Sequence, residues 1–186
     1  MKNYKLILLA VFYLASQPIL TAAEPTSSEA SAQASYFATL GSLCGQRFEG
    51  EMTFPTEGQD SFAGKLLVAE FASCDDTEVR VPFAVGEDRS RTWIFSKLKS
   101  GLQLKHDHRH EDGTPDDINM YGGMTAQEGT ALSQSFAADE HTATIIPEAS
   151  TNVWTVSLNE DATVLTYYLE RHAAPRFKAV LKRVVD

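Results

Sequence analysis

The amino-acid sequence predicts an all-β domain of about nine or ten short antiparallel strands, arranged as a barrel or a sandwich. From residue 47 onward apolar and polar residues alternate, which is the period of a half-buried strand. Turn-forming residues separate these runs at regular intervals, and no internal repeat or second domain is visible. The 186 residues suit one domain with a sizeable core.

Residues 1–23 are expected to be a secretory signal peptide, not part of the fold. A basic start precedes an apolar run over 6–14, and the small residues Thr21 and Ala23 suit a signal peptidase. The apolar run is too short for a comfortable membrane span, so we expect no stable membrane insertion; an uncleaved N-terminal anchor is the alternative. The mature chain would start at Glu24 and be exported to the periplasm or the extracellular space.

The charge of the chain argues against two classes of partner. The net charge is −9, and removal of the two lysines in the signal segment takes it to −11. No basic run occurs anywhere in the mature chain. We therefore expect no binding to nucleic acid or to anionic lipid. The oligomeric state is not indicated by the sequence.

Residues 24–39 are predicted to be a flexible lead-in followed by a short helix. The first part is rich in serine and alanine, whereas Ala34, Phe37 and Leu40 have nearly helical spacing before Gly41. This helix would close one end of a β-domain over residues 40–186. The runs that predict strands are 47–54, 65–71, 78–85, 91–95, 101–106, 131–136, 152–158, 162–170 and 176–184.

The two cysteines, Cys44 and Cys74, are predicted to form a disulfide, as is usual in an exported protein. Strand pairing supports the same bond. If the run 47–54 pairs antiparallel with 64–71 about a turn centred at Gln59, Phe48 lies opposite Glu70 and the two cysteines lie opposite one another. A pair of reactive thiols is the alternative, but the sequence has no C-x-x-C motif.

A second hairpin is predicted around a tight turn at Lys99 and Ser100. It sets Phe95 opposite Leu104, Trp93 opposite His106, Arg91 opposite His108 and Arg89 opposite His110. Because side chains two residues apart share a face, the apolar face of this hairpin continues into a cluster of arginine and histidine. A bulge or a longer turn would change this register.

The stretch "KHDHRHEDG" at this end of the hairpin has three interpretations. Zinc could be held by His106, His108 and His110, with Glu111 as general base of an enzyme. Side chains two apart on one strand stand about 6.6 Å apart, so three could not close around one ion without a bend. Arginines opposite histidines suit an anion better than a cation. A network of paired charges that closes the barrel end is the third interpretation.

Several motifs resemble a group of uncharacterised exported bacterial proteins that share G-x-D-R-S-R-T-W and K-H-D-H-R-H-E-D-G signatures. They are "CGQRFEGEM", "FAGKLLV", "VPFAVGEDRSRTWIF", "GLQLKHDHRHEDG", "YGG" and "NVWTVSL", in this order. The resemblance covers roughly residues 40–184 and implies a family without implying a reaction. A looser resemblance is to lipocalin-like (calycin) barrels, through "LGSLCGQRFEG", and it implies a single antiparallel β-barrel that takes small ligands.

The sequence favours a binding protein over an enzyme. A small anionic or amphipathic molecule would enter the barrel, whose apolar part Trp93 and Phe95 would line. Zinc is the cofactor of the alternative enzyme, and a structural envelope module without ligand is a third hypothesis. The residues predicted to contact the ligand are Arg89, Arg91, Trp93, His106, His108 and Tyr121.

Overall fold

The computed structural model describes residues 27–54, 61–127 and 129–185, so the predicted signal peptide lies outside the described residues. The strands are β1 (Arg47–Phe54), β2 (Leu67–Glu70), β3 (Ser73–Cys74), β4 (Glu78–Val85), β5 (Asp88–Leu98), β6 (Gly101–His108), β7 (Tyr121–Thr125), β8 (Ser133–Ala138), β9 (Val153–Leu158), β10 (Val164–Arg171) and β11 (Ala174–Arg183). The helices are α1 (Ser27–Ser42), α2 (Glu140–Ile145) and the short 3₁₀ helix η1 (Pro147–Ala149).

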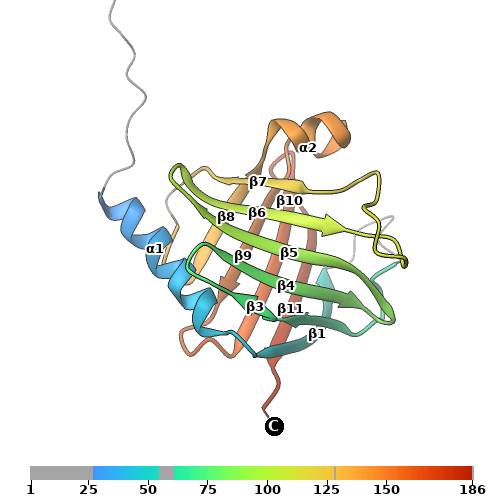
Figure 1. Ribbon diagram of the computed structural model, residues 1–186, viewed down its shortest axis with the longest axis horizontal. Coiled ribbons are helices and arrows are strands. Elements are labelled where there is room, and N and C mark those ends of the chain that lie inside the picture. The colour runs from blue at the N-terminus through green and yellow to red at the C-terminus, as the bar shows by residue number, and fades with distance from the viewer. Residues whose placement is uncertain (1–26, 55–60, 128, 186) are drawn as a thin grey trace, which may run out of the picture.

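The strands form one closed antiparallel β-barrel (Figure 1). Within the described residues the order is β2-β1-β11-β10-β9-β8-β7-β6-β5-β4, and β2 pairs with β4 to close a ring of ten strands. The two-residue strand β3 adds to β4 outside this ring. The predicted all-β barrel is therefore confirmed. Closure leaves the ring without free edges, which protects the strands from pairing with other chains.

The register of the β5–β6 hairpin is the predicted one. Its turn joins Leu98 to Gly101, and Trp93 pairs with His106 while Arg91 pairs with His108. The ladder ends at that last pair, so the predicted pairing of Arg89 with His110 is not part of it.

The register predicted for the first hairpin is wrong by one residue. Phe48 pairs with Ala69, and both of these residues are buried. Arg47 pairs with Glu70, and both of these residues are exposed. A shift of one residue turns every side chain to the opposite face, and the observed register is the one that keeps Phe48 and Ala69 in the core.

The predicted disulfide is confirmed, although it is not a bond across the β1–β2 ladder. Cys44 lies in the turn that follows α1, and Cys74 lies in β3, which pairs with β4. Their Cα atoms are 6.0 Å apart and the two residues are separated by 30 positions. The bond therefore ties the end of the helix to the barrel wall.

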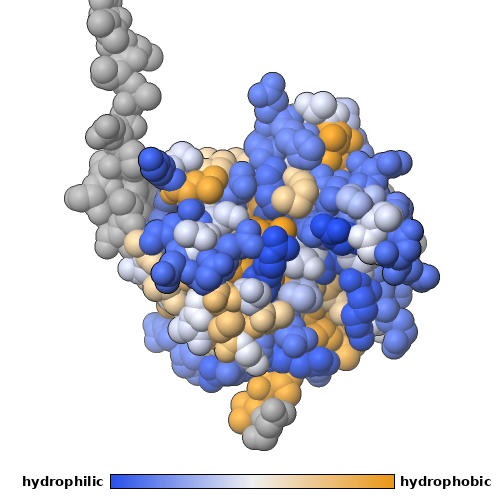
Figure 2. All heavy atoms as spheres, in the orientation of Figure 1, coloured by the Kyte–Doolittle hydropathy of each residue, from blue (hydrophilic) through white to orange (hydrophobic). Residues whose placement is uncertain are grey.

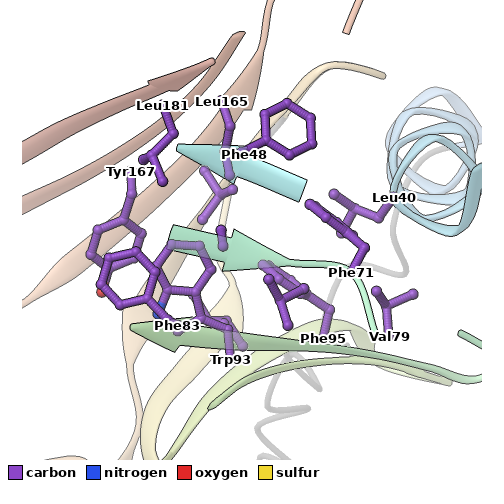
Figure 3. Close-up of a cluster of buried hydrophobic side chains, with 14 of the residues drawn as sticks. Leu40, Phe48, Phe71, Val79, Phe83, Trp93, Phe95, Leu165, Tyr167 and Leu181 are labelled. Carbon is purple, nitrogen blue, oxygen red and sulfur yellow. The ribbon is translucent and has the colours of Figure 1, made fainter. Parts of the chain in front are cut away.

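Helix α1 closes one end of the barrel. It runs two residues beyond position 40, where the barrel was predicted to start. Tyr36, Phe37, Leu40 and Leu43 belong to the buried core, and the hydroxyl of Tyr36 donates a hydrogen bond of 3.1 Å to the Val156 carbonyl. Figure 3 shows Leu40 projecting from the helix toward barrel residues. The core thus continues from the strands into the helix.

Strand β7 and helix α2 are elements that the sequence reasoning missed. The "YGG" stretch is not among the runs that predict strands, but it begins a five-residue strand between β6 and β8. A Cβ on Gly122 would lie 2.0 Å from the Leu104 carbonyl oxygen, and one on Gly123 would lie 1.6 Å from that of Ala137. Only glycine permits this approach of neighbouring backbones, and glycine carries no pattern of alternation.

The surface of the barrel is mainly hydrophilic on the face shown in Figure 2, where apolar residues form separate small groups. Among the described residues, no helix is long and apolar enough to cross a membrane.

Candidate functional site

A cavity of about 380 Å³ lies at the end of the barrel opposite α1. Gln33 of α1 lies against the β5–β6 turn at Gly101, whereas Arg91 and His108, at the other end of the same hairpin, line the cavity. The remaining lining residues are Phe62, Phe83, Trp93, His106, Asp116, Ile118, Tyr121, Ile146, Ala149, Asn152, Trp154, Tyr167, Leu169, Arg171 and Phe177. Most of the lining is therefore apolar or aromatic, with a few polar groups.

Three stacked aromatic rings form one wall of the apolar part of the cavity. The Trp93 ring stacks on Phe83 with centroids 4.4 Å apart and on Tyr167 with centroids 4.6 Å apart, each with 19° between the planes. They come from β5, β4 and β10, and they lie together in Figure 3. Such near-parallel rings add roughly 0.5–1.5 kcal/mol per pair to the stabilisation from burial, so this wall is rigid.

His106 is a buried member of the cavity lining with both ring nitrogens bonded. Its Nδ1 lies 3.1 Å from the Tyr121 carbonyl oxygen and its Nε2 lies 2.8 Å from the Tyr167 hydroxyl. A carbonyl only accepts, so we assign the proton to Nδ1, and the Tyr167 hydroxyl then donates to Nε2. The imidazole also stacks on the Tyr121 ring with centroids 4.6 Å apart.

The surroundings of His106 and Tyr167 keep the imidazole and the hydroxyl uncharged. The pKa of His106 is lowered to about 4, mainly by burial; the hydrogen bond to the Tyr121 carbonyl opposes this effect, and the charges of Lys105 and His108 add to it. Burial also raises the pKa of Tyr167 well above its ordinary value. At neutral pH both groups are therefore neutral, and neither adds a charge to the cavity.

His108 lies at the rim of the cavity beside an acidic group. Its Nδ1 is 3.3 Å from Asp116 Oδ2, and its Nε2 is 3.3 Å from the Ser90 hydroxyl. His110 is more exposed, and its Nδ1 lies 4.0 Å from the same oxygen. The backbone N–H of Ile118 is the main cause of a lowered pKa of Asp116, with a further contribution from the His108 hydrogen bond.

The structure does not gather the predicted zinc ligands. His106 is in the interior, His108 is at the rim, and His110 and Glu111 are exposed beyond the end of β6. Among the residues that the structure describes, no group of three or more histidine, cysteine, aspartate and glutamate side chains is placed to hold a metal ion. Both nitrogens of His106 are also engaged, so it would have to leave its partners before it could bind a metal.

Arg91 lines the cavity, as the ligand hypothesis expects, but its charge is already compensated. Its Nη1 donates a hydrogen bond of 2.5 Å to Asp88 Oδ2, and its guanidinium carbon lies 5.5 Å from the centroid of the Phe62 ring. Although burial opposes it, hydrogen bonds from Ser90 and Arg91 bring the pKa of Asp88 down to about 2. Arg91 thus belongs to an ion pair at the rim.

The other predicted contact residues divide between the cavity and the surface. Trp93, His106, His108 and Tyr121 all line the cavity. Arg89 does not; it is exposed and donates a hydrogen bond of 2.7 Å to the Gly86 carbonyl. It is the second residue of β5 and precedes the part of that strand that pairs with β6. Phe95 is buried in the core and is not among the cavity residues.

Sequence reasoning missed Arg171 and Asn152, which lie on the other side of the cavity. Arg171 is the last residue of β10, and its Nε donates a hydrogen bond of 2.9 Å to Asn152 Oδ1. The signal was present, because Leu165, Tyr167, Leu169 and Arg171 alternate along one face and the first two are buried. The same reasoning that found Arg91 on β5 would have found Arg171.

Comparisons of the chain with protein-family models, with curated proteins and with solved structures found no match.

Proposed function

We propose that this protein is exported and that its barrel binds a small amphipathic molecule with an anionic group. The observation that carries the proposal is the cavity of about 380 Å³, in which stacked aromatic rings are combined with arginine side chains near the rim. Ligand sites typically have volumes of roughly 300–1,000 Å³, mostly apolar walls and a few polar groups. The cavity matches all three properties.

The chemistry of the lining supports an amphipathic ligand over a fully polar one. An apolar body would gain from contact with Trp93 and Tyr167, because burial of apolar area is worth about 25 cal/mol per Å². The lining holds two arginines, Arg91 and Arg171, and the carboxylate of Asp116; since Arg91 is paired with Asp88, Arg171 supplies the attraction for an anion. An anionic end near the rim would therefore be attracted, and the ordering of charge and apolar surface in the cavity would orient the molecule.

Export is the second part of the proposal. The Cys44–Cys74 disulfide supports it, because such bonds persist in oxidising compartments such as the periplasm and the extracellular space. The sequence of residues 1–23 supports it as well. Mass spectrometry of the protein recovered from the exporting cell should give a chain that begins at Glu24; a full-length chain would contradict export with cleavage.

Two alternatives predict different observations. A structural module without ligand would have a filled interior with its charges paired, whereas this barrel contains a cavity. A zinc enzyme would need its ligands close together, and the described His106, His108 and His110 do not form such a group. Binding of a small molecule is therefore the function that the geometry supports best.

The test uses the fluorescent anion 1-anilinonaphthalene-8-sulfonate as a probe. Both tryptophans of the sequence, Trp93 and Trp154, line the cavity, so energy transfer from them reports on a molecule bound there. We expect saturable one-to-one binding that Leu169→Phe, which fills part of the cavity, weakens about tenfold, as a loss of about 1.4 kcal/mol would. Leu98→Phe, at the exposed turn near α1, is the matched control. Equal binding by all three proteins would contradict the proposal.

A further inference from the structure

The two arginines that line the cavity differ in their partners. Arg91 has a carboxylate, Asp88, at 2.5 Å, and its guanidinium also lies over an aromatic ring. Arg171 has an amide partner, Asn152. Among the described residues, no carboxylate lies within 4.0 Å of the Arg171 guanidinium. Of these two cations, Arg171 is therefore the one whose charge lacks a close counter-ion.

The surroundings of Arg171 make this charge costly. Burial lowers its pKa, and the positive charge of Arg176 lowers it further, while the negative charge of Glu148 opposes the effect. A guanidinium without a counter-ion in a partly buried site would be stabilised by an anion placed beside it.

Asn152 holds Arg171 in place for such an anion. Its side chain is only 4% exposed, and its Oδ1 accepts the hydrogen bond from Nε. The two terminal nitrogens of the guanidinium make no hydrogen bond to the described residues, so they stay available as donors. This end of the group matches the two oxygens of a carboxylate, with which arginine forms paired hydrogen bonds.

We propose that Arg171 is the residue that anchors the ligand, that the anchored group is a carboxylate, and that the ligand carries a planar apolar body held at the Trp93–Tyr167 stack. This inference rests on the proposed function and adds to it the chemical class of the ligand. The charge balance favours a monoanion, because Asp116 also lines the cavity and would repel a second negative charge. The aromatic lining favours a flat body, since stacked rings make their best contacts with planar groups.

The experiment titrates the full exported protein with naphthalene-2-carboxylate and with the neutral naphthalene-2-carboxamide, which share a planar body and differ in charge. Quenching of the tryptophan fluorescence reports binding, since both tryptophans line the cavity. The variants are Arg171→Gln and the matched Arg91→Gln, which remove the same charge on opposite sides of the cavity. Naphthalen-2-yl phosphate, a dianion, is the third probe.

We expect the wild type to bind the carboxylate at least about tenfold more tightly than the amide, which is the effect of a hydrogen bond to a charged group. Arg171→Gln should weaken carboxylate binding by about the same factor while leaving amide binding unchanged. The retained amide binding shows that the variant is folded. Arg91→Gln should change carboxylate binding by less than about threefold, and the phosphate should bind more weakly than the carboxylate in the wild type.

Other outcomes separate the two proposals. If neither naphthalene compound quenches the wild type, the proposed function and the anchor fail together. If both bind equally and Arg171→Gln binds them as the wild type does, the cavity takes ligands but Arg171 is not the anchor. If only Arg91→Gln loses the carboxylate, Arg91 is the anchor. A phosphate bound more tightly than the carboxylate would overturn the ligand class.

Discussion

The imidazole Nε2 of His106 lies 2.8 Å from the hydroxyl of Tyr167. These residues belong to β6 and β10, which are separated by three strands in the barrel, so the hydrogen bond crosses the interior. It is embedded among aromatic rings, with Trp154 5.4 Å from the imidazole centroid. A polar bond in such surroundings is stable only while the imidazole is neutral, because a buried charge without a counter-ion is strongly disfavoured.

The stability of the protein should therefore fall in mild acid. Burial lowers the pKa of His106 to about 4 in the folded protein, whereas an unfolded chain has a histidine pKa of about 6.5. As the pH falls below 6.5, the unfolded state takes up the proton first. Stability is thus fully present above this pH and declines toward pH 4, with a loss of roughly 2 kcal/mol between pH 7 and pH 5. Urea unfolding at the two pH values measures it.

His106→Gln is the control for this prediction, because glutamine does not titrate and can still bond to Tyr167. Between pH 7 and pH 5 the free energy of unfolding of the variant should fall by less than that of the wild type. The difference between the two changes should be about the 2 kcal/mol assigned to the histidine. The comparison cancels the contributions of the other titrating groups. Parallel curves for the two proteins would mean that His106 takes up its proton equally in the folded and unfolded states.

The disulfide should contribute strongly to stability. A bond that closes a loop of about 30 residues restricts the unfolded chain by roughly 3–4 kcal/mol. Replacement of both Cys44 and Cys74 by serine should lower the free energy of unfolding by up to this amount, measured by urea unfolding. A reductant should destabilise the wild type and leave the variant unchanged. If the reductant destabilised the wild type and the variant equally, its effect would not come from the Cys44–Cys74 bond.

Two hairpins show how far sequence reasoning reaches for this fold. The β5–β6 turn is tight, so its position fixed the register, and the pairs Trp93 with His106 and Arg91 with His108 followed. The segment between β1 and β2 is longer, so its residues do not fix the centre of the turn. Moving the assumed centre by half a residue changes every pair of the hairpin by one residue. Burial of Phe48 and Ala69 selects the true register. That selection depends on the assembled core, which the turn residues do not encode.

The candidate site could likewise be predicted only in part from the sequence. Alternation placed Trp93, His106 and His108 in the cavity because all of them lie on one hairpin. Arg171 belongs to β10, and its place across the cavity depends on how ten strands close into a ring. The distinction between Arg91 and Arg171 depends further on their partners, which are Asp88 at the start of β5 and Asn152 before β9. The alternation of a strand can show that a charged residue points into the barrel. It cannot show whether that charge has a counter-ion.

The ion pair between Lys105 and Asp139 should hold helix α2 against the barrel. Lys105 Nζ lies 2.5 Å from Asp139 Oδ2, and the lysine is only 8% exposed. Asp139 is also the N-cap of α2, where its Oδ1 accepts from the Thr142 N–H at 3.0 Å. Asp139→Ala would remove the cap and leave a buried cation unpaired, so we expect a loss of about 3 kcal/mol in urea unfolding.

Asp161→Ala is the matched control for that measurement, since Asp161 accepts hydrogen bonds from Thr163 in an exposed turn but has no ion pair among the described residues. Asp161→Ala should lower the free energy of unfolding by about 1 kcal/mol or less. Lys105→Met combined with Asp139→Asn should recover part of the loss, because no unpaired charge then remains. Equal losses for the two alanine variants would show that the ion pair adds nothing beyond the cap.

The last prediction concerns the residue that positions Arg171. Asn152→Asp would set a carboxylate 2.9 Å from the Arg171 Nε and supply the counter-ion that the site lacks. Binding of naphthalene-2-carboxylate should then weaken about tenfold or more, because the ligand would have to compete with a fixed anion, while binding of the amide should not change. Asn159→Asp adds the same charge in an exposed turn and should leave both affinities as they are. Tighter binding of the carboxylate by Asn152→Asp would contradict the role of Arg171, since an added negative charge can only repel an anion held there.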